Sequence, residues 1–539
     1  MLERVRSASV DRVSAPLVLA MAAPLLVALG ILLARPSHIA ALGDDAVIER
    51  TVRSIGPHFE LLGPYSRFGW HHPGPMEFYL LALPYRLAGA APVSLPAATL
   101  VSNIGCLVGI AILLRRHAGI PAMLLGLIAA GACLLAAAPG FLVNDWNPYL
   151  PFLPFTLAVL ACWAVLEGDR WALPLSLSIA SLCVQSHVGY AVGVGAIAVA
   201  VAALALVKGR LSRRQTDAAD ETRVILRRRW LAPVALSIGV LLLLWLPVVV
   251  QQVTHRPGNI TLLLRYFSST SPDWSYTQGL RELSTSVGRL PALVFAVSPR
   301  PRFLAPAALP LGFGVFGLAA FVISAVVIAM TRRRALPLVV LTITLAVAVD
   351  VAVHHVVGPL FTYLVPFTGA VGVLCWATVG VALQPVARRL SAGVAPVRVA
   401  ASVAGALALL LVFVPLAFRA RPQSSFNDRN VVPLAADIAA WSRSHPGSIR
   451  LEAAPTTGLV GASAQTMGVL LRLERASTPV RVSHDLDLTL ERAPSAGNEK
   501  ANWLVQIALT DGTSARPTSG QHVLATRGTV AAYVSRLSN

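Results

Sequence analysis

The sequence has few charged residues. Asp, Glu, Lys and Arg make up 13% of its 539 residues, whereas hydrophobic residues make up 55%. Soluble globular domains carry charge on about a quarter of their residues, so this composition excludes an ordinary soluble protein. Acidic residues are the scarcest: 25 Asp and Glu stand against 44 Lys and Arg, which gives a net charge of +19. We therefore predict a membrane protein, in which the position of the basic residues explains the excess charge.

Cysteine is also scarce. The chain has five cysteines, and all of them fall within long apolar runs, where a thiol behaves as a small apolar group. Their spacing gives no disulfide framework and no zinc-binding pattern, so the sequence predicts no metal-ligating set. The cysteines are Cys106, Cys133, Cys162, Cys183 and Cys375.

Long apolar runs, by contrast, are abundant. A helix needs about 20 apolar residues to cross a hydrocarbon core of about 30 Å, and such runs recur along residues 1–422. The predicted fold class is an α-helical polytopic membrane protein with about 11 transmembrane helices. The predicted spans are 15–34, 94–114, 118–138, 150–167, 171–187, 190–207, 231–250, 304–330, 335–354, 360–383 and 397–418.

Basic residues cluster in every second loop between these runs. Short cytoplasmic loops carry such an excess of Lys and Arg, so the pattern indicates topology rather than nucleic-acid binding. It predicts a multi-pass plasma-membrane protein with a cytoplasmic N-terminus and an extracytoplasmic C-terminus. The first apolar run is about 20 residues, longer than a usual signal-peptide core, and we interpret it as a retained span. The clusters are Arg4, Arg6 and Arg12, then Arg115 and Arg116, 208–229, 332–334, and Arg388 and Arg389.

The outer loops hold most of the polar and aromatic motifs. The first, 35–93, contains two short helical segments, "DDAVIERTVRSIG" and "PMEFYLLALPYRLAG", which we expect to lie in the membrane interface. A second loop reads "FLVNDWNPY", and a third, 251–303, contains "THRPGNITLLLRYF". The fifth span ends in "CVQSHVGY" and the ninth in "DVAVHHVVGPLFTYLVP". Polar residues at span ends need water or a partner, so this convergence predicts a cavity that opens outward near the lipid headgroups.

Residues 423–539 differ in kind from the apolar part. Their periodicity predicts a helix at 433–445, the strand "SIRLEA", the helix "GASAQTMGVLLRLERA" and the strands "VRVS", "WLVQIAL" and "HVLAT", followed by a final helix. This pattern is typical of a small extracytoplasmic α/β domain. It contains no phosphate loop, metal-spaced residues or serine elbow, so the sequence assigns it no chemistry.

The first outer loop carries a family resemblance. "LGDDAVIERTVRSIG" followed by "GPYSRFGWHHPGPMEFYLLALPYRLAG" resembles the corresponding loop of the GT-C glycosyltransferases, in the protein mannosyltransferase-like, aminoarabinose-transferase-like and RgtA-type branch. Those enzymes carry an acidic pair, a short helix, a proline-centred motif and a second helix. Here Asp44 and Asp45 replace the usual Asp-Glu pair, and His72, Pro73 and Gly74 replace Lys-Pro-Pro. "PLFTYLVPFTGA" is similar to a later "RYLLP" motif, with Thr362 in place of arginine.

The resemblance implies an inverting glycosyltransferase, for hexose or pentose. It would move a sugar from a polyprenyl-phosphate carrier, within the membrane lipids, to an extracytoplasmic glycan, lipid or protein. The resemblance implies no certain cofactor and does not decide whether a divalent cation takes part in the reaction. One carboxylate would accept the proton of the acceptor, and cations would stabilise the departing phosphate. The implied residues are Asp44 as base with Asp45 as orienter or second choice, Arg67, His71, His72 and Arg265 for phosphate, and Trp70, Asp145, Asn147 and His187 for the pocket.

Several of these residues also have a structural interpretation. Asp44 or Asp45 could cap the helix that follows, since Asp is a preferred N-cap. Trp70 could anchor the membrane interface, and His187 could be a buried histidine with satisfied hydrogen bonds. The two aspartates are adjacent and would point about 100° apart on a helix, so one substrate atom would meet only one of them.

Two other classes compete with a transferase. A transporter or a flippase of envelope precursors would place ionisable residues at the middle of the bilayer, on broken helices, and would often show related halves. The polar residues here cluster at outer span ends. A non-catalytic membrane protein with the same fold is the other alternative, and an activity assay separates it from an enzyme.

Overall fold

The computed structural model describes residues 2–34, 41–215, 220–297, 308–391, 395–422, 428–455, 462–482, 501–510 and 520–537. Parts of several predicted segments lie outside the described residues. They are 35–40 of the first outer loop, 216–219 of the basic cluster 208–229, 298–303 of the third outer loop, 304–307 of the eighth span, and 423–427, 456–461, 483–500 and 511–519 of the C-terminal region.

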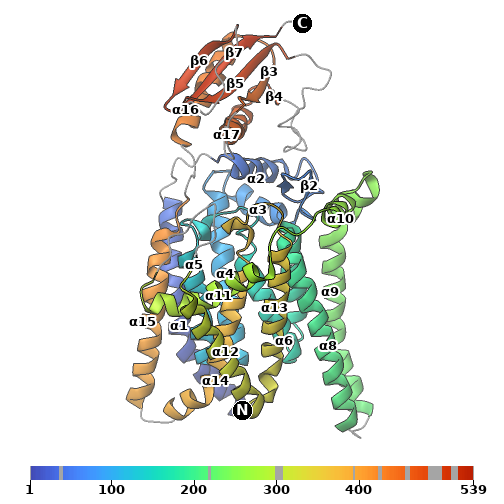
Figure 1. Ribbon diagram of the computed structural model, residues 1–539, viewed down its shortest axis with the longest axis vertical. Helices are drawn as coiled ribbons and strands as arrows, with labels where there is room; N and C mark the ends of the chain where they lie inside the picture. Colours follow the sequence, from blue (N-terminus) through green and yellow to red (C-terminus); the bar gives the residue numbers. More distant parts are fainter. Residues whose placement is uncertain are drawn as a thin grey trace.

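Each of the eleven predicted spans contains one apolar helix, and together these helices form the bundle in Figure 1. Among the described residues, eight helices are long and apolar enough to cross a membrane. α5, α6 and α7 have 17, 15 and 15 residues and so reach roughly 22 to 26 Å, which leaves the count of eleven crossings a prediction. The helices are α1 (Leu2–Ala34), α4 (Ser94–His117), α5 (Ile120–Ala136), α6 (Phe152–Leu166), α7 (Ala172–Ser186), α8 (Ala191–Gln215), α9 (Asp220–Thr254), α12 (Leu311–Thr331), α13 (Leu336–His354), α14 (Thr368–Ser391) and α15 (Ala395–Arg419).

Small residues let the central helices approach closely. A Cβ atom at Gly380 on α14 would lie 2.4 Å from the Cα atom of Ala122 on α5. Helices in a membrane gain little hydrophobic free energy from association, because lipid is as apolar as their side chains. They therefore often pack closely at small residues such as these. α6 is buried on nearly all sides, as expected for a helix that is apolar all round. α6 therefore occupies the interior of the bundle.

One end of the bundle, which we call the α2/α3 end, carries most of the short elements (Figure 1). α2 (Gly43–Ser54) and α3 (Met76–Leu87) confirm the two predicted short helices. The third predicted loop contains α10 (Asn259–Ser269) and α11 (Tyr276–Val294), and α11 packs against α12, α13 and α14. The remaining short elements of this end are β1 (Tyr65–Ser66), β2 (Trp70–His71), η1 (Phe141–Val143), η2 (Val188–Tyr190) and η4 (Thr362–Leu364). A further short element, η3 (Arg333–Ala335), joins α12 to α13 away from this end.

The C-terminal region forms an α/β domain above α2 (Figure 1). Its sheet has the order β4-β3-β5-β7-β6, with β4, β3 and β5 parallel and β7 antiparallel to both of its neighbours. The elements are α16 (Asp428–Ser444), β3 (Ile449–Ala453), α17 (Ala462–Arg475), β4 (Val480–Val482), β5 (Trp503–Leu509), β6 (His522–Arg527) and β7 (Val530–Arg536).

The predicted final helix is wrong. Residues 530–536 form β7, which pairs with β5 on one side and β6 on the other. Gly528, with a φ of 55°, makes the tight turn from β6 into β7. Two ladders of backbone hydrogen bonds and the burial of Val530 and Ala532 outweigh the helical propensity of the alanines.

Candidate active site

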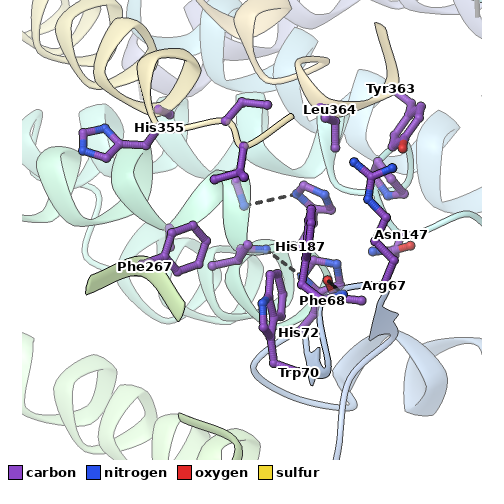
Figure 2. A pocket seen from close by; sticks show the side chains of 18 of the residues that line it. Arg67, Phe68, Trp70, His72, Asn147, His187, Phe267, His355, Tyr363 and Leu364 are labelled. Atoms are coloured by element: carbon purple, nitrogen blue, oxygen red, sulfur yellow. Dashed lines mark hydrogen bonds between the residues drawn. The ribbon is translucent and has the colours of Figure 1, made fainter. Parts of the chain in front are cut away.

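A cavity of about 550 Å³ lies at the α2/α3 end. Five separate segments line it: residues 44–72 of the first loop, 146–148, the junction of α7 and α8, α10, and the stretch between α13 and α14. This confirms the predicted convergence of distant motifs. Figure 2 shows Arg67, Trp70, His72 and His187 around this space.

The β1–β2 hairpin carries Arg67 and Phe68 at its turn. Tyr65 pairs with His71 and Ser66 with Trp70, and Gly69 closes the turn with a φ of 79°. The chain just after the hairpin contacts the end of α7, where the Gly74 N–H donates a hydrogen bond to the carbonyl oxygen of Gln185. A Cβ at Gly74 would lie 2.4 Å from the Gln185 side chain, so glycine at this position of the "HHPGP" motif lets the loop pack closely on α7.

Asp44 lies in the first turn of α2 and lines the cavity. Leu42 is the N-cap residue and makes no side-chain cap hydrogen bond, so neither aspartate caps the helix. Tyr65 instead donates its hydroxyl proton to Asp44 Oδ1. Burial raises the pKa of Asp44, while the hydrogen bonds from Tyr65 and Trp146 oppose that rise. The helix N-terminus also favours the ionised carboxylate.

Asp45 points elsewhere, as the angle between adjacent helical residues requires. It is absent from the described cavity lining, and burial together with the charge of Asp44 raises its pKa to about 7. Asp145 is buried and lies close enough to feel Asp45; burial and the charge of Asp45 raise the pKa of Asp145 well above its usual range. Burial and the neighbouring negative charge thus favour the protonated form of both carboxyl groups. Asp44 is therefore the carboxylate that faces the cavity.

His72 and His187 form a buried pair at the cavity wall. Their ring centroids lie 4.6 Å apart, and each Nδ1 accepts a backbone N–H at 3.1 Å, from Val188 and Gly189 respectively. An accepting nitrogen carries no proton, so each neutral ring carries its proton on Nε2. Burial and the neighbouring histidines lower the pKa of His72 well below its usual value. Both rings are thus neutral N–H donors at this wall.

An aromatic wall continues from the histidines to α10. Trp70 is 5% exposed, and its ring lies 5.4 Å from His72, 5.6 Å from Tyr266 and 5.9 Å from Phe267 between centroids. The Asn259 side chain joins α10 to the hairpin, because it accepts the His71 N–H and donates to the His71 carbonyl, each at 2.8 Å. Burial lowers the pKa of His71 to about 4.

Arg67 supplies the guanidinium group of the described lining. Its Cζ atom lies 4.9 Å from the Phe68 ring centroid and 5.6 Å from that of Phe361. These two rings flank the cation without neutralising its charge. The side chain lies beside the cavity in Figure 2, close to Asn147 and Tyr363.

The structure brings together six of the ten residues named from the sequence. Asp44, Arg67, Trp70, His72, Asn147 and His187 line the cavity. Asp45, His71 and Asp145 lie behind the described lining, and Arg265 is exposed on α10 outside it. The lining also includes four residues that were not predicted from the sequence, namely Tyr65, Trp146, Tyr266 and Tyr363. All four are aromatic residues within the quoted loop motifs, and this is the signal that could have identified them.

Residues for a divalent cation do not come together in the described parts of the chain. No three side chains of His, Cys, Asp and Glu within them are grouped so that they could hold a metal ion.

Comparison with known proteins identifies the fold. No family model matches the chain, and no curated protein matches it. The structure of ArnT from Cupriavidus metallidurans bound to undecaprenyl phosphate matches with a TM-score of 0.52 and 15% identity, over 95% of this chain and 97% of that one. The apo structure of the same protein matches with a TM-score of 0.50 and 14% identity, over the same shares, 95% and 97%. The chain therefore has the GT-C fold of ArnT, as the resemblance of its first outer loop predicts.

Proposed function

We propose that the chain is a membrane glycosyltransferase that moves a sugar from a polyprenyl-phosphate carrier to a hydroxyl group of an extracytoplasmic glycan, lipid or protein. The observation that carries this proposal is one cavity with a carboxylate, Asp44, a guanidinium group, Arg67, and the neutral donors His72 and His187. The GT-C fold supports it, as does the undecaprenyl phosphate bound to ArnT.

In the proposed reaction the acceptor oxygen attacks the anomeric carbon on the face opposite the phosphate. The new carbon–oxygen bond forms as the bond from the anomeric carbon to the phosphate oxygen breaks, so the configuration inverts. The hydroxyl proton passes to the Asp44 carboxylate, and polyprenyl phosphate leaves with the bonding electrons. Arg67 and the Nε2–H groups of His72 and His187 would hold the phosphate oxygens as their charge increases. The apolar and aromatic wall would exclude water from this step.

The experiment that tests the function follows the lipid-linked sugar. The purified protein is reconstituted in vesicles with a panel of polyprenyl-phosphate pentoses and hexoses, and the release of polyprenyl phosphate is measured with and without acceptor extract. In parallel, envelope glycans and lipid-linked sugars are compared before and after deletion of the gene. We expect one donor to be consumed in the vesicles and to accumulate in the deletion strain. Movement of a donor across the vesicle membrane without its consumption would instead indicate a flippase.

The proposed topology places the α2/α3 end outside the cytoplasm. The basic residues Arg332, Arg333 and Arg334 lie together at a second cavity with His117 and Glu167, on helices that lead away from that end. We predict that a His58→Cys variant, exposed after α2, reacts with an impermeant maleimide in intact cells. Thr331→Cys, exposed beside the arginines, should react only after permeabilisation. The reverse pattern would overturn the orientation and with it the proposed site of transfer.

A Tyr65→Phe variant should shift the acid limb of the pH profile of kcat/KM to higher pH. The Tyr65 hydrogen bond lowers the pKa of Asp44 against burial, so its loss raises that pKa. Asp44 acts as a base only when it is ionised, so activity is lost as the pH falls through this pKa, and a higher pKa brings the loss at a higher pH. Tyr533→Phe in β7 is the matched control and should keep the wild-type profile. An unchanged acid limb in Tyr65→Phe would mean that Asp44 does not govern it.

A further inference from the structure

α2 has two apolar faces that belong to different parts of the molecule. One face lies in the hydrophobic core of the C-terminal domain, with Leu434 and Leu470, and the other lies on α3, with Phe78 and Leu81. The first face, with its preceding residue, is Leu42, Ala46 and Val47, and the second is Ile48, Val52 and Ile55. The helix that carries Asp44 is therefore held between two bodies, as Figure 1 shows.

Two ion pairs connect α2 to α17 of the C-terminal domain. The Arg50 Nε atom on α2 lies 2.9 Å and 3.0 Å from the two carboxylate oxygens of Glu474 on α17. The next residue of α17, Arg475, donates to the buried Glu49 and, at 3.0 Å, to the Tyr85 hydroxyl of α3. Tyr85 donates in turn to Glu49 Oε1 at 3.0 Å. Arg475 thus joins α17, α2 and α3 in one network.

The C-terminal domain also contacts the entry of α2, beside the cavity. Gly43 has a φ of 51°, and a Cβ there would lie 3.5 Å from the Cβ of Ala464 on α17. Gly468 of α17 faces Leu42, where an added Cβ would lie 2.3 Å from Leu42 Cδ2. Asp44 follows directly in the chain, so the position of its carboxylate depends on how α17 seats this turn.

We infer that the C-terminal domain is a positioning element for the proposed base: through Arg50–Glu474 and Glu49–Arg475 it fixes α2 in the orientation that presents Asp44 to the cavity. This inference rests on the proposed function and deepens it, because it gives a role to a domain that has no chemistry of its own. Glu49 and Arg50 are positioning residues that act through Asp44.

We call the contact between α2 and the C-terminal domain the clamp. Reversal of the charges of Arg50 and Glu474 tests it, with all variants compared at equal protein levels in the membrane. Arg50→Glu and Glu474→Arg should each lower kcat by roughly 10- to 100-fold, because a displaced base costs rate steeply. The KM for the lipid-linked donor should change by less than about threefold, since the phosphate contacts of Arg67 and His72 are not on α2. The double reversal restores the opposite charges and should return kcat to within about threefold of wild type.

Arg527→Glu is the matched control. Arg527 pairs with Asp437 inside the C-terminal domain, at 2.7 Å, in a more exposed ion pair that does not touch α2. Its reversal should change kcat by less than about threefold. The inference is overturned if the Arg50→Glu and Glu474→Arg variants keep full kcat, if the double reversal gives no rescue, or if Arg527→Glu loses as much rate.

Hydrogen exchange separates this inference from the proposed function. The amides of residues 46–54 should exchange faster in Arg50→Glu and Glu474→Arg and return to the wild-type rate in the double reversal, whatever reaction the protein catalyses. If the wild type transfers no sugar but shows this pattern, the proposed function fails and the clamp stands. If α2 exchanges at the same rate in all four proteins, the clamp fails.

Discussion

Asp44→Asn should lower kcat for sugar transfer by roughly 10²- to 10⁴-fold, the range typical of a lost general base. The amide keeps the size of the side chain and can still accept the Tyr65 hydrogen bond, but it cannot take the proton of the acceptor hydroxyl. Folding should be preserved, because asparagine has nearly the same shape as aspartate and Asp44 lies at the cavity wall. The measurement is the release of polyprenyl phosphate under single-turnover conditions, at equal protein levels in the membrane.

Asp45→Asn is the control that separates the two aspartates. Asp45 has a pKa raised to about 7 and so is largely protonated below neutral pH, where an amide imitates it closely. We therefore expect its variant to keep most of its activity at pH 6 and to lose less than the Asp44 variant at every pH. If Asp45→Asn is inactive while Asp44→Asn is active, the roles must be exchanged. If both are fully active, the base is neither of them.

Arg67→Gln should lower kcat/KM for the lipid-linked donor by roughly 10²- to 10³-fold, comparable to the loss of one donor that stabilises a developing charge. Arg67 brings a permanent positive charge to the described lining, whereas His72 and His187 are held as neutral donors. Arg67→Lys should recover part of the loss, because it keeps the charge without the forked donor geometry. The measurement is initial rate against donor concentration.

The matched control for Arg67 is Arg256→Gln, an exposed arginine between α9 and α10 that is absent from the described lining. It should stay within about threefold of wild type. Equal losses in both variants would show a general surface-charge effect rather than a phosphate contact. Arg265→Gln, tested alongside, decides whether the exposed Arg265 has the phosphate role that the sequence suggested for it.

Periodicity and length predicted much of the fold. The eleven apolar helices follow from runs of apolar residues, and α2 and α3 follow from short segments with polar and apolar faces. α11 was missed because its helix pattern lies in a loop between spans, although it packs among α12, α13 and α14. β7 was misread because an Ala-rich segment became an interior strand through pairing with β5 on one side and the adjacent β6 on the other.

The candidate site was predicted as a set of loops rather than as a set of contacts. The His72–His187 pair joins residues from the first loop and from the end of α7, and only tertiary packing shows that their rings meet. The β1–β2 hairpin has two residues in each strand, too few for a periodic signal, yet it brings Tyr65 to Asp44. The choice between Asp44 and Asp45 likewise needs the rotation of α2 about its axis.

Because α2 shares a hydrophobic core with the C-terminal domain, the site can be completed only late in the synthesis of the chain. The Arg50–Glu474 pair spans 424 residues of sequence, so at 5 to 20 residues per second the ribosome adds the partner of α2 roughly 20 to 85 seconds after α2 itself. Throughout that interval the apolar residues Leu42, Ala46 and Val47 lack the surface that covers them in the finished molecule. Under the proposed function, the nascent protein would thus carry an incomplete site until its C-terminal domain has been synthesised and has packed on α2.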